Sequence, residues 1–322
     1  MVKHVFGPVP SRRLGRSLGI DPVPLKTCNW NCVYCQLGRT NPFVTERQYF
    51  FKNEDILTQV REVLDAHTPG DIDWVTFVGS GETTLHAGLG EMIREVKSMT
   101  DLPVAVITNG TLLYLPEVRV ELNAADAVLP SLDAGNPDLY RKINRPHPDL
   151  TFDRLVNGLI EFRKGYNNHL WVEVMLVGGL NDSEKALSEI AGWIEKIHPD
   201  EVHIVQPTRP PVEVWVKPPD EEALSRAHAI LGKVATLVMP AMGSFDFGSE
   251  DDLIEAIIGI ITRHPMQESQ LIESLKKYSL KDVKETLCAL ENSGKAQVVT
   301  RYGKRFWSAS EASYPAEKQD KS

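Results

Sequence analysis

Three cysteines lie close together near the start of the chain, at Cys28, Cys32 and Cys35. Their spacing, C-x3-C-x2-C, places three thiolates on one loop. Such a loop can bind three irons of a [4Fe–4S] cluster and leave the fourth iron open to another ligand. An open iron distinguishes a cluster that does chemistry from one that only stores electrons. The spacing therefore predicts a metal site with a reactive iron.

A structural zinc ion is the alternative for these three cysteines. Zinc usually takes four nitrogen or sulfur ligands in structural sites. The histidines that could complete the set are distant in sequence, since His4 lies upstream and His67 and His86 lie far downstream. A cluster is therefore favoured over zinc. The remaining cysteine, Cys288, has leucines around it and is expected to be a small core residue.

Composition narrows the class of protein. The 322 residues can form one large domain, or a large and a small one. Contents of 42% hydrophobic and 25% charged residues are ordinary for a soluble globular protein. No apolar run is long enough to span a bilayer and no leader is recognisable, so we expect no membrane partner. Three clustered cysteines among four suit a reducing cytoplasm better than a disulfide framework.

Strands and helices alternate around the cysteine loop and continue to about residue 240. Each expected strand is short, rich in Val, Ile or Leu, and bounded by Gly, Pro, Asn or Asp. Six β–α units predict a parallel sheet, either open and doubly wound or a partial (β/α)6 barrel. In both folds the loop after the first strand lies at the carboxyl edge, where sites form. The expected strands are 17–22, 74–78, 104–108, 127–132, 170–177 and 201–206, and the expected helices are 55–67, 89–98, 154–164, 183–198 and 219–233.

The pattern changes after residue 250. Three short helices are expected there, followed by two strand-like runs that form a hairpin. Three helices and a hairpin predict a winged-helix domain. The helices are expected at 251–263, 267–275 and 280–291, and the strands at 296–300 and 305–308.

Charge gives this C-terminal domain two possible roles. The whole chain carries a net charge of -9, which argues against indiscriminate binding to nucleic acid. Residues 251–310 are nearly neutral, with nine Lys or Arg and eight Asp or Glu. A local basic surface favours nucleic acid, whereas winged helices also dock on proteins, and both roles stay open. The basic residues are Lys276, Lys277, Lys281 and Lys284 near the third helix and Arg301, Lys304 and Arg305 on the hairpin.

The cysteine loop, with the aromatic Tyr34 just before its last cysteine, resembles the signature of the radical S-adenosylmethionine (SAM) superfamily. The resemblance implies a partial TIM-type barrel and two cofactors, a [4Fe–4S] cluster and SAM. In that family the open iron binds the amino and carboxylate groups of SAM. One electron, from a donor such as flavodoxin or ferredoxin, then releases a 5'-deoxyadenosyl radical that abstracts a substrate hydrogen. The organisation implied is a radical SAM core over 1–240, a linker over 241–250, a winged-helix domain over 251–310 and a disordered tail over 311–322.

A turn after the second expected strand is similar to the Gly-Gly-Glu motif of the family. It consists of Gly79, Ser80, Gly81 and Glu82. The resemblance implies that this turn binds the SAM amino group. Glycines allow close approach of the backbone, and a carboxylate pairs with an ammonium. The alternative is a tight β–α turn with an acid at a helix start.

The resemblance places SAM contacts at the ends of the next two strands. Thr108 and Asn109 end the third strand, and Ser131 and Asp133 end the fourth. In the family, polar side chains at these positions meet the ribose and carboxylate of SAM. The same residues are also good turn formers, which is the alternative for each.

Adenine recognition is implied at the last two strands. Met175 and Val177 end the fifth strand, where the family packs adenine against apolar side chains. Gln206 ends the sixth, where the backbone usually contacts adenine. Tyr34 is expected to contribute its backbone to the same recognition.

A wider stretch resembles one group within the superfamily, the relatives of the 4-demethylwyosine synthases, which build a tricyclic base on tRNA. The similar residues are 9–20, 35–38, 79–82, 131–134 and 144–146. Those enzymes carry extra upstream cysteines for a second cluster, and no cysteine precedes Cys28 here. A mechanism that depends on a second cluster is therefore not expected. The resemblance makes a tRNA the expected partner.

Four polar residues are predicted substrate contacts. Arg13 and Arg16 precede or enter the first strand, and Asn144 and Arg145 form a separate loop. Arg13 and Arg16 could bind an anionic substrate or make the surroundings of the cluster more positive. The alternative is a solvated surface with ion pairs.

Three functions are compatible with these features. The first is a radical SAM enzyme that modifies an RNA base, in the oxidoreductase or the lyase and transferase class. The second is the same chemistry on a small molecule or polypeptide, with the winged helix as a docking module. The third is an iron–sulfur redox sensor that binds DNA. The 79–82 turn argues against the third, because a sensor needs no SAM pocket.

Overall fold

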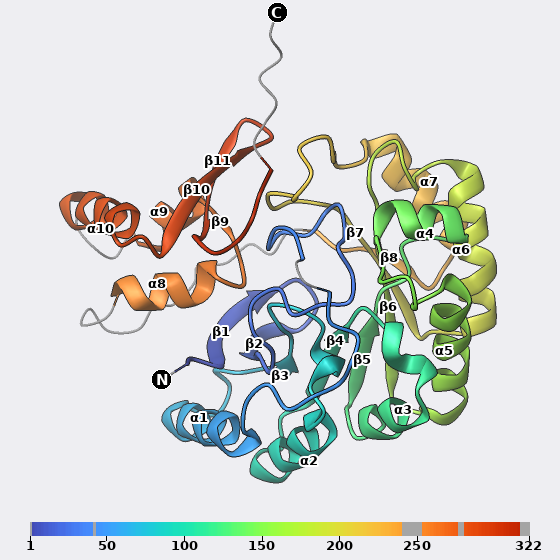
Figure 1. Ribbon diagram of the computed structural model, residues 1–322, viewed down its shortest axis with the longest axis horizontal. Coiled ribbons are helices and arrows are strands. Elements are labelled where there is room, and N and C mark those ends of the chain that lie inside the picture. The colour runs from blue at the N-terminus through green and yellow to red at the C-terminus, as the bar shows by residue number, and fades with distance from the viewer. Residues whose placement is uncertain (1, 41–42, 240–252, 276–279, 316–322) are drawn as a thin grey trace, which may run out of the picture.

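An eight-stranded, mostly parallel sheet forms the larger part of the molecule (Figure 1). The computed structural model describes residues 2–40, 43–239, 253–275 and 280–315. Strand β1 pairs with β2 in antiparallel orientation, and β2 to β8 are parallel and follow one another in chain order. The strands are β1 (Val5–Ser11), β2 (Gly15–Ile20), β3 (Trp74–Phe77), β4 (Val104–Thr108), β5 (Ala127–Pro130), β6 (His169–Met175), β7 (Glu201–Val205) and β8 (Ala235–Leu237).

Helices cover the outer face of this sheet (Figure 1). The strand order never reverses, so the sheet has the order of a partial barrel and not of a doubly wound fold. The expected parallel α/β architecture is confirmed, with β8 as an additional short strand. Within the described ranges, no helix combines the length and apolar character needed to cross a membrane. The helices are α1 (Asn53–Ala66), α2 (Leu89–Met99), α3 (Pro116–Leu122), α4 (Pro137–Ile143), α5 (Phe152–Gly165), α6 (Glu184–Ile197) and α7 (Glu221–Leu231), with 3-10 turns η1 (Thr83–Leu85) and η2 (Thr111–Tyr114).

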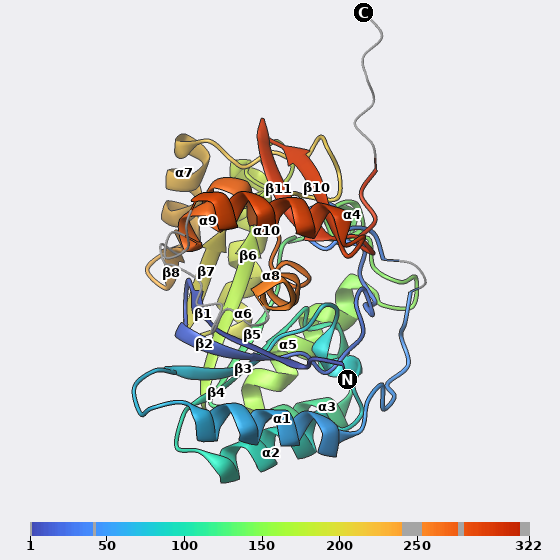
Figure 2. The same cartoon turned by 90° about the vertical axis from the view of Figure 1, so that its left-hand side faces the viewer.

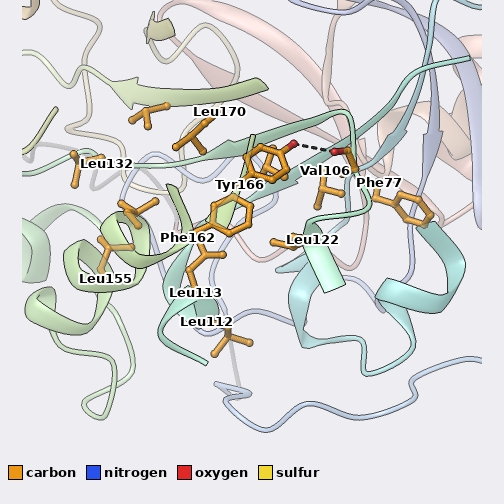
Figure 3. Packing of buried hydrophobic residues seen from close by; sticks show 14 of the residues in the cluster. Phe77, Val106, Leu112, Leu113, Leu122, Leu132, Leu155, Phe162, Tyr166 and Leu170 are labelled. Atoms are coloured by element: carbon orange, nitrogen blue, oxygen red, sulfur yellow. Dashed lines mark hydrogen bonds between the residues drawn. The ribbon is translucent and has the colours of Figure 1, made fainter. Parts of the chain in front are cut away.

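Alternation along the strands separates a helix-facing core from an inner face. On β6, Leu170 and Val172 are fully buried against the helices, while the intervening Trp171 and Glu173 turn to the inner face. Figure 3 shows part of the helix-facing core, where the rings of Phe162 and Tyr166 stack at 4.6 Å between centroids. The Tyr166 hydroxyl donates a hydrogen bond to the Ala125 carbonyl, so this buried phenol is satisfied.

The tip of the β1–β2 hairpin enters the inner face of the barrel. Leu14 at this tip is buried in a small apolar cluster with Ala105, Ala127 and Leu129 of β4 and β5. Because Leu14 anchors the tip there, the neighbouring Arg12 and Arg13 are carried into the barrel as well. Strand β1 was not predicted from the sequence.

The C-terminal elements form a separate cluster away from α1 and α2 (Figures 1 and 2). They have their own core, which includes Ile257, Leu271 and Trp307. The three expected helices and the hairpin are present, and the short β9 completes an antiparallel sheet in the order β10-β11-β9. The expected linker over 241–250 lies outside the described residues. The elements are α8 (Leu253–Ile261), β9 (Met266–Gln267), α9 (Glu268–Ser274), α10 (Leu280–Asn292), β10 (Ala296–Arg301) and β11 (Lys304–Ala309).

The first residues of the expected disordered tail are packed against the barrel. Ala312 is buried, and the Tyr314 hydroxyl donates to the carbonyl of Gln36. The amide of Arg39 donates to the carbonyl of Ser313 at 2.9 Å. The prediction of disorder is therefore wrong for 311–315, because this segment is fixed by the loop that follows the cysteines. Residues 316–322 lie outside the described part of the chain.

Candidate functional site

The loop after β2 carries the three cysteines at the carboxyl ends of the strands. All three thiols are free and half-buried. Each sulfur has its own nitrogen neighbour. Lys26 Nζ lies 3.1 Å from Cys35 Sγ, Asn109 Nδ2 lies 3.9 Å from Cys28 Sγ, and Asn144 Nδ2 lies 3.8 Å from Cys32 Sγ. N–H groups around sulfur stabilise negative charge there.

The chemistry of this donor set fits an iron–sulfur cluster. Burial raises the pKa of Cys28 to about 12 and raises the pKa of Cys32 well above its usual value, so thiolates need cations beside them here. In a [4Fe–4S] cluster each thiolate bonds a different iron. Among the described residues, no three or more His, Cys, Asp or Glu side chains are grouped as one metal ion requires. The zinc alternative therefore has no support in the described part of the chain.

The end of α4 holds the cysteine loop in place. The amide of Asn31 donates to the Asn144 carbonyl at 3.0 Å, and the amide of Val33 donates to the Ile143 carbonyl at 2.9 Å. Asn144 is fully buried, so the structure gives this predicted substrate residue a positioning role instead. Arg145, the other predicted residue of this loop, pairs with Glu213 at 2.6 Å.

The 79–82 turn packs directly against the cysteine loop. The amide of Lys26 donates to the Ser80 carbonyl at 2.7 Å, and the amide of Glu82 donates to the Thr27 carbonyl at 2.8 Å. A Cβ on Gly81 would lie 1.8 Å from the Thr27 oxygen, so only glycine allows this approach. A Cβ on Gly79 would meet less crowding, 2.9 Å from Val23 Cγ2 and 3.0 Å from Asp21 Oδ1. The cysteine loop and the 79–82 turn are therefore held together by backbone hydrogen bonds.

The Glu82 carboxylate is occupied by internal donors. Its Oε1 accepts from the amide and hydroxyl of Thr84 and from the Thr108 hydroxyl, and its Oε2 accepts from the Asn109 amide at 2.6 Å. Glu82 is 2% exposed, and burial raises the pKa of its carboxyl group. The prediction that this carboxylate pairs with an ammonium ligand is not supported by this geometry. Glu82 instead fixes the end of β4.

Asp133 makes a second network of the same kind. Its Oδ2 accepts from the Tyr34 hydroxyl at 2.5 Å and from Asn144 Nδ2 at 2.6 Å, and its Oδ1 accepts from the Met175 amide at 2.8 Å. Burial raises the pKa of Asp133. This carboxylate therefore joins the cysteine loop to β6 and does not face a ligand. Val177 is fully buried in the apolar cluster behind Tyr34 and Met175.

Two predicted residues remain free to face a bound molecule. Ser131 is half-buried, and its backbone pairs in parallel with that of Glu173 on β6. Gln206 directly follows β7 and is also half-buried. Both therefore lie at the carboxyl ends of strands, as expected.

The two predicted arginines of the first hairpin have different positions. Arg16 lies at the amino end of β2, is exposed, and pairs with Asp73 at 3.0 Å. The cysteine loop follows the other end of this strand, so the structure does not support Arg16 as a substrate contact. Arg13 pairs with Glu173 on the inner face of the barrel.

Sequence reasoning missed two residues that touch the motifs. Lys26 adopts a φ of 61° and reaches Cys35, and its position two residues before Cys28 was the available signal. Asp21 accepts from the Ser80 hydroxyl at 2.6 Å and from Arg263 Nε at 2.7 Å. Because Arg263 follows α8, the C-terminal elements contact the 79–82 turn through Asp21.

The basic surface predicted on the C-terminal domain is reduced. Arg301 is buried, with Nε donating to the Pro211 carbonyl at 3.2 Å, and Arg305 pairs with Glu268. Lys304 is exposed. Cys288 is also exposed, so its prediction as a core residue is wrong. Lys276 and Lys277 lie outside the described residues, as do the side chains of Lys281 and Lys284.

Comparison with known proteins decides the family. The family model described as the radical SAM superfamily matches residues 23–194, more than half of the chain. This chain belongs to the radical SAM superfamily. Members of this superfamily are enzymes that use a [4Fe–4S] cluster and SAM.

Relatives extend the similarity beyond the matched core. A UPF0026 protein of Methanocaldococcus jannaschii is 35% identical over 94% of this chain and 94% of its own length. A protein named GTPase Obg from Brachyspira hyodysenteriae is 40% identical over 85% of this chain, which spans only 42% of that relative. A radical SAM methyltransferase from Sphaerobacter thermophilus shares the fold, with a TM-score of 0.53 and 17% identity over 69% of this chain and 66% of its own. The grouping with 4-demethylwyosine synthases stays a prediction.

Proposed function

We propose that this radical SAM enzyme cleaves SAM reductively and uses the resulting radical to modify an RNA base, with a tRNA as partner. Cys28, Cys32 and Cys35 would hold the cluster. One observation carries the proposal: three half-buried thiols, each beside an N–H donor, lie against a glycine turn at the carboxyl ends of parallel strands. When bound, the cluster and SAM supply an electron and a 5'-deoxyadenosyl radical.

The residues of this chain bind and orient SAM. The carbonyl oxygens of the 79–82 turn would accept from the SAM amino group, because the Glu82 carboxylate already accepts four hydrogen bonds. Ser131 offers a polar side chain for the carboxylate or ribose. Asn109, whose side chain already bonds to Asn29 and Thr111, would act by positioning the loop. The half-buried Met175 provides an apolar surface for adenine.

Adenine has two further neighbours in this proposal. Gln206, after β7, and Tyr34 would contribute backbone groups to the edge of the base. The Tyr34 ring is held by its bond to Asp133, which keeps this part of the cysteine loop in one position. Thr108 and Asp133 act through their neighbours, since each bonds to a group of the protein.

A tRNA base is the proposed target. The similarity to the wyosine group in residues 9–20 and 35–38 supports it. The C-terminal order of helix, strand, two helices and two strands supports the proposed winged helix. At the tip of its hairpin, Tyr302 is 37% exposed beside the exposed Lys304, and an aromatic ring with a cation suits an unpaired base and its phosphate. The proposed location is the cytoplasm, with flavodoxin or ferredoxin as electron donor.

Nucleosides from cells with and without the gene test the target. Loss of one modified nucleoside from tRNA, restored by the wild-type gene and not by Cys32→Ala, is the expected result. An unchanged set of tRNA nucleosides would contradict the target. A change confined to small metabolites would transfer the same chemistry to a small-molecule substrate.

A further inference from the structure

Three arginines from distant parts of the sequence meet near the inner face of the barrel. Arg12 and Arg13 lie at the tip of the β1–β2 hairpin, and Arg209 lies in the segment after β7. The guanidinium of Arg12 donates to the hydroxyl of Thr208, which is 196 positions away in sequence. Burial lowers the pKa of Arg209, and the neighbouring charge of Arg12 lowers it further, to about 10.

These arginines have mostly neutral partners. Arg209 Nη1 donates to Gln36 Oε1 at 3.1 Å and lies 2.8 Å from His264 Nδ1. Burial and the Arg209 charge hold the pKa of His264 well below its usual value, so its imidazole is neutral. Among the described residues that bond to the three guanidinium groups, Glu173 supplies the negative charge, through Arg13.

The charges of the three arginines and Glu173 do not cancel, so positive charge remains in a partly buried part of the protein. Three guanidinium groups face one carboxylate, so two positive charges are in excess. The side chain of Arg13 is 16% exposed, and its Nε is sealed from solvent without a hydrogen-bond partner in the described part of the chain. Burying an uncompensated charge is costly, and apolar side chains would fill the same space at lower cost. A role in folding alone does not explain the cluster.

The cluster borders the proposed active site. Gln36, which accepts from Arg209, directly follows Cys35. Glu173, which pairs with Arg13, lies beside Ser131 through a backbone pairing just after β5. A ligand on the arginines would therefore lie against the residues assigned to the cluster and SAM.

We propose that Arg12, Arg13 and Arg209 form an oxyanion subsite for a phosphate or carboxylate group of the substrate. Guanidinium groups bind both kinds of oxyanion through paired N–H donors. The bound anion would balance the excess positive charge. This inference rests on the proposed function, because it assigns part of the substrate of the same site.

Calorimetric titration of the reconstituted full-length protein tests the subsite. Tripolyphosphate serves as the phosphate probe and citrate as the carboxylate probe. Wild type and the control Arg16→Gln should bind the same probe with equal affinity, because Arg16 is exposed at the other end of β2. Arg209→Gln should bind at least tenfold more weakly, and Arg209→Lys should retain part of the affinity because it keeps the charge. The probe that binds identifies the anion class.

Several results would overturn the subsite. The first is a wild-type protein that binds neither probe, and the second is an Arg209→Gln variant that binds a probe as tightly as wild type does. The third is complete competition between SAM and the probe, which would assign the arginines to the SAM carboxylate. Arg12→Gln gives a second variant, and thermal unfolding verifies that each variant is folded. Wild-type protein that cleaves SAM but binds no anion rejects the subsite alone, and anion binding without SAM cleavage rejects the proposed function alone.

Discussion

Two polar regions lie in the same barrel and differ in how completely their charges are matched. Around Glu82 and Asp133, every carboxylate oxygen accepts a hydrogen bond from the protein. Around Arg13 and Arg209, guanidinium groups outnumber carboxylates. The first region is complete without a ligand and holds the loops in position. The second lacks a counter-charge. The difference distinguishes residues that position the loops of the site from residues that are available to bind a ligand.

The largest effect is expected where the cysteine loop loses a thiol. Cys32→Ala should abolish the absorbance of the reconstituted cluster, because the remaining two thiols cannot hold three irons. Cys288→Ala is the matched control, since Cys288 is exposed in α10 and should leave the absorbance unchanged. Normal cluster content in Cys32→Ala would refute the assignment.

The region around Glu82 and Asp133 should lose stability when the Glu82 carboxylate is removed. Glu82→Ala leaves four donor contacts without a partner in a buried place, so the free energy of unfolding should fall by about 3 kcal/mol in chemical denaturation. Glu95→Ala, on the exposed face of α2, is the control and should change it by less than about 0.5 kcal/mol. A loss below about 1 kcal/mol for Glu82→Ala would remove the structural role proposed for the carboxylate.

A cation beside the cysteines should tune the cluster. Lys26 places its ammonium 3.1 Å from Cys35 Sγ, and positive charge with a hydrogen bond to sulfur favours the reduced cluster. Lys26→Met should lower the equilibrium constant for reduction about tenfold, which is about 59 mV for one electron. A redox titration followed by electron paramagnetic resonance measures the shift. Lys26→Arg should stay near wild type, and equal potentials in all three proteins would exclude the tuning role.

The smallest effect on the free energy of unfolding is expected in the arginine cluster, where substitution should not cause the loss expected for Glu82→Ala. Arg209→Met removes a cation whose partners are neutral, so the free energy of unfolding without ligand should change by less than about 1 kcal/mol or rise. The same denaturation experiment as for Glu82→Ala provides the comparison. A loss above about 2 kcal/mol would show that Arg209 is needed for folding.

The fold was predictable where its signals are local. The parallel strands β2 to β7 are short runs that contain Val, Ile or Leu between turn residues, and each was expected close to its observed place. Strand β1 was missed because Gly7 and Pro8 interrupt its pattern, and β8 because it has only three residues.

The motifs of the site were predictable from the sequence, but the hydrogen bonds between their side chains were not. The cysteine spacing and the 79–82 turn could be recognised as motifs from the sequence, whereas their backbone contact is known from the structure. The sequence shows a carboxylate at Glu82, but not that Thr84, Thr108 and Asn109 would bond to it. The hydrogen bond from Arg12 to Thr208 depends on how the hairpin tip enters the barrel, so no local sequence pattern predicts it.

The central claim is that three thiolates leave one iron open for SAM. Electron–nuclear double resonance on the reduced protein tests it directly, with SAM labelled with oxygen-17 in its carboxylate and nitrogen-15 in its amino group. We predict hyperfine coupling from both labels to the cluster in the wild-type protein. A fully reconstituted cluster that shows no coupling to either label in the presence of saturating SAM would contradict the account.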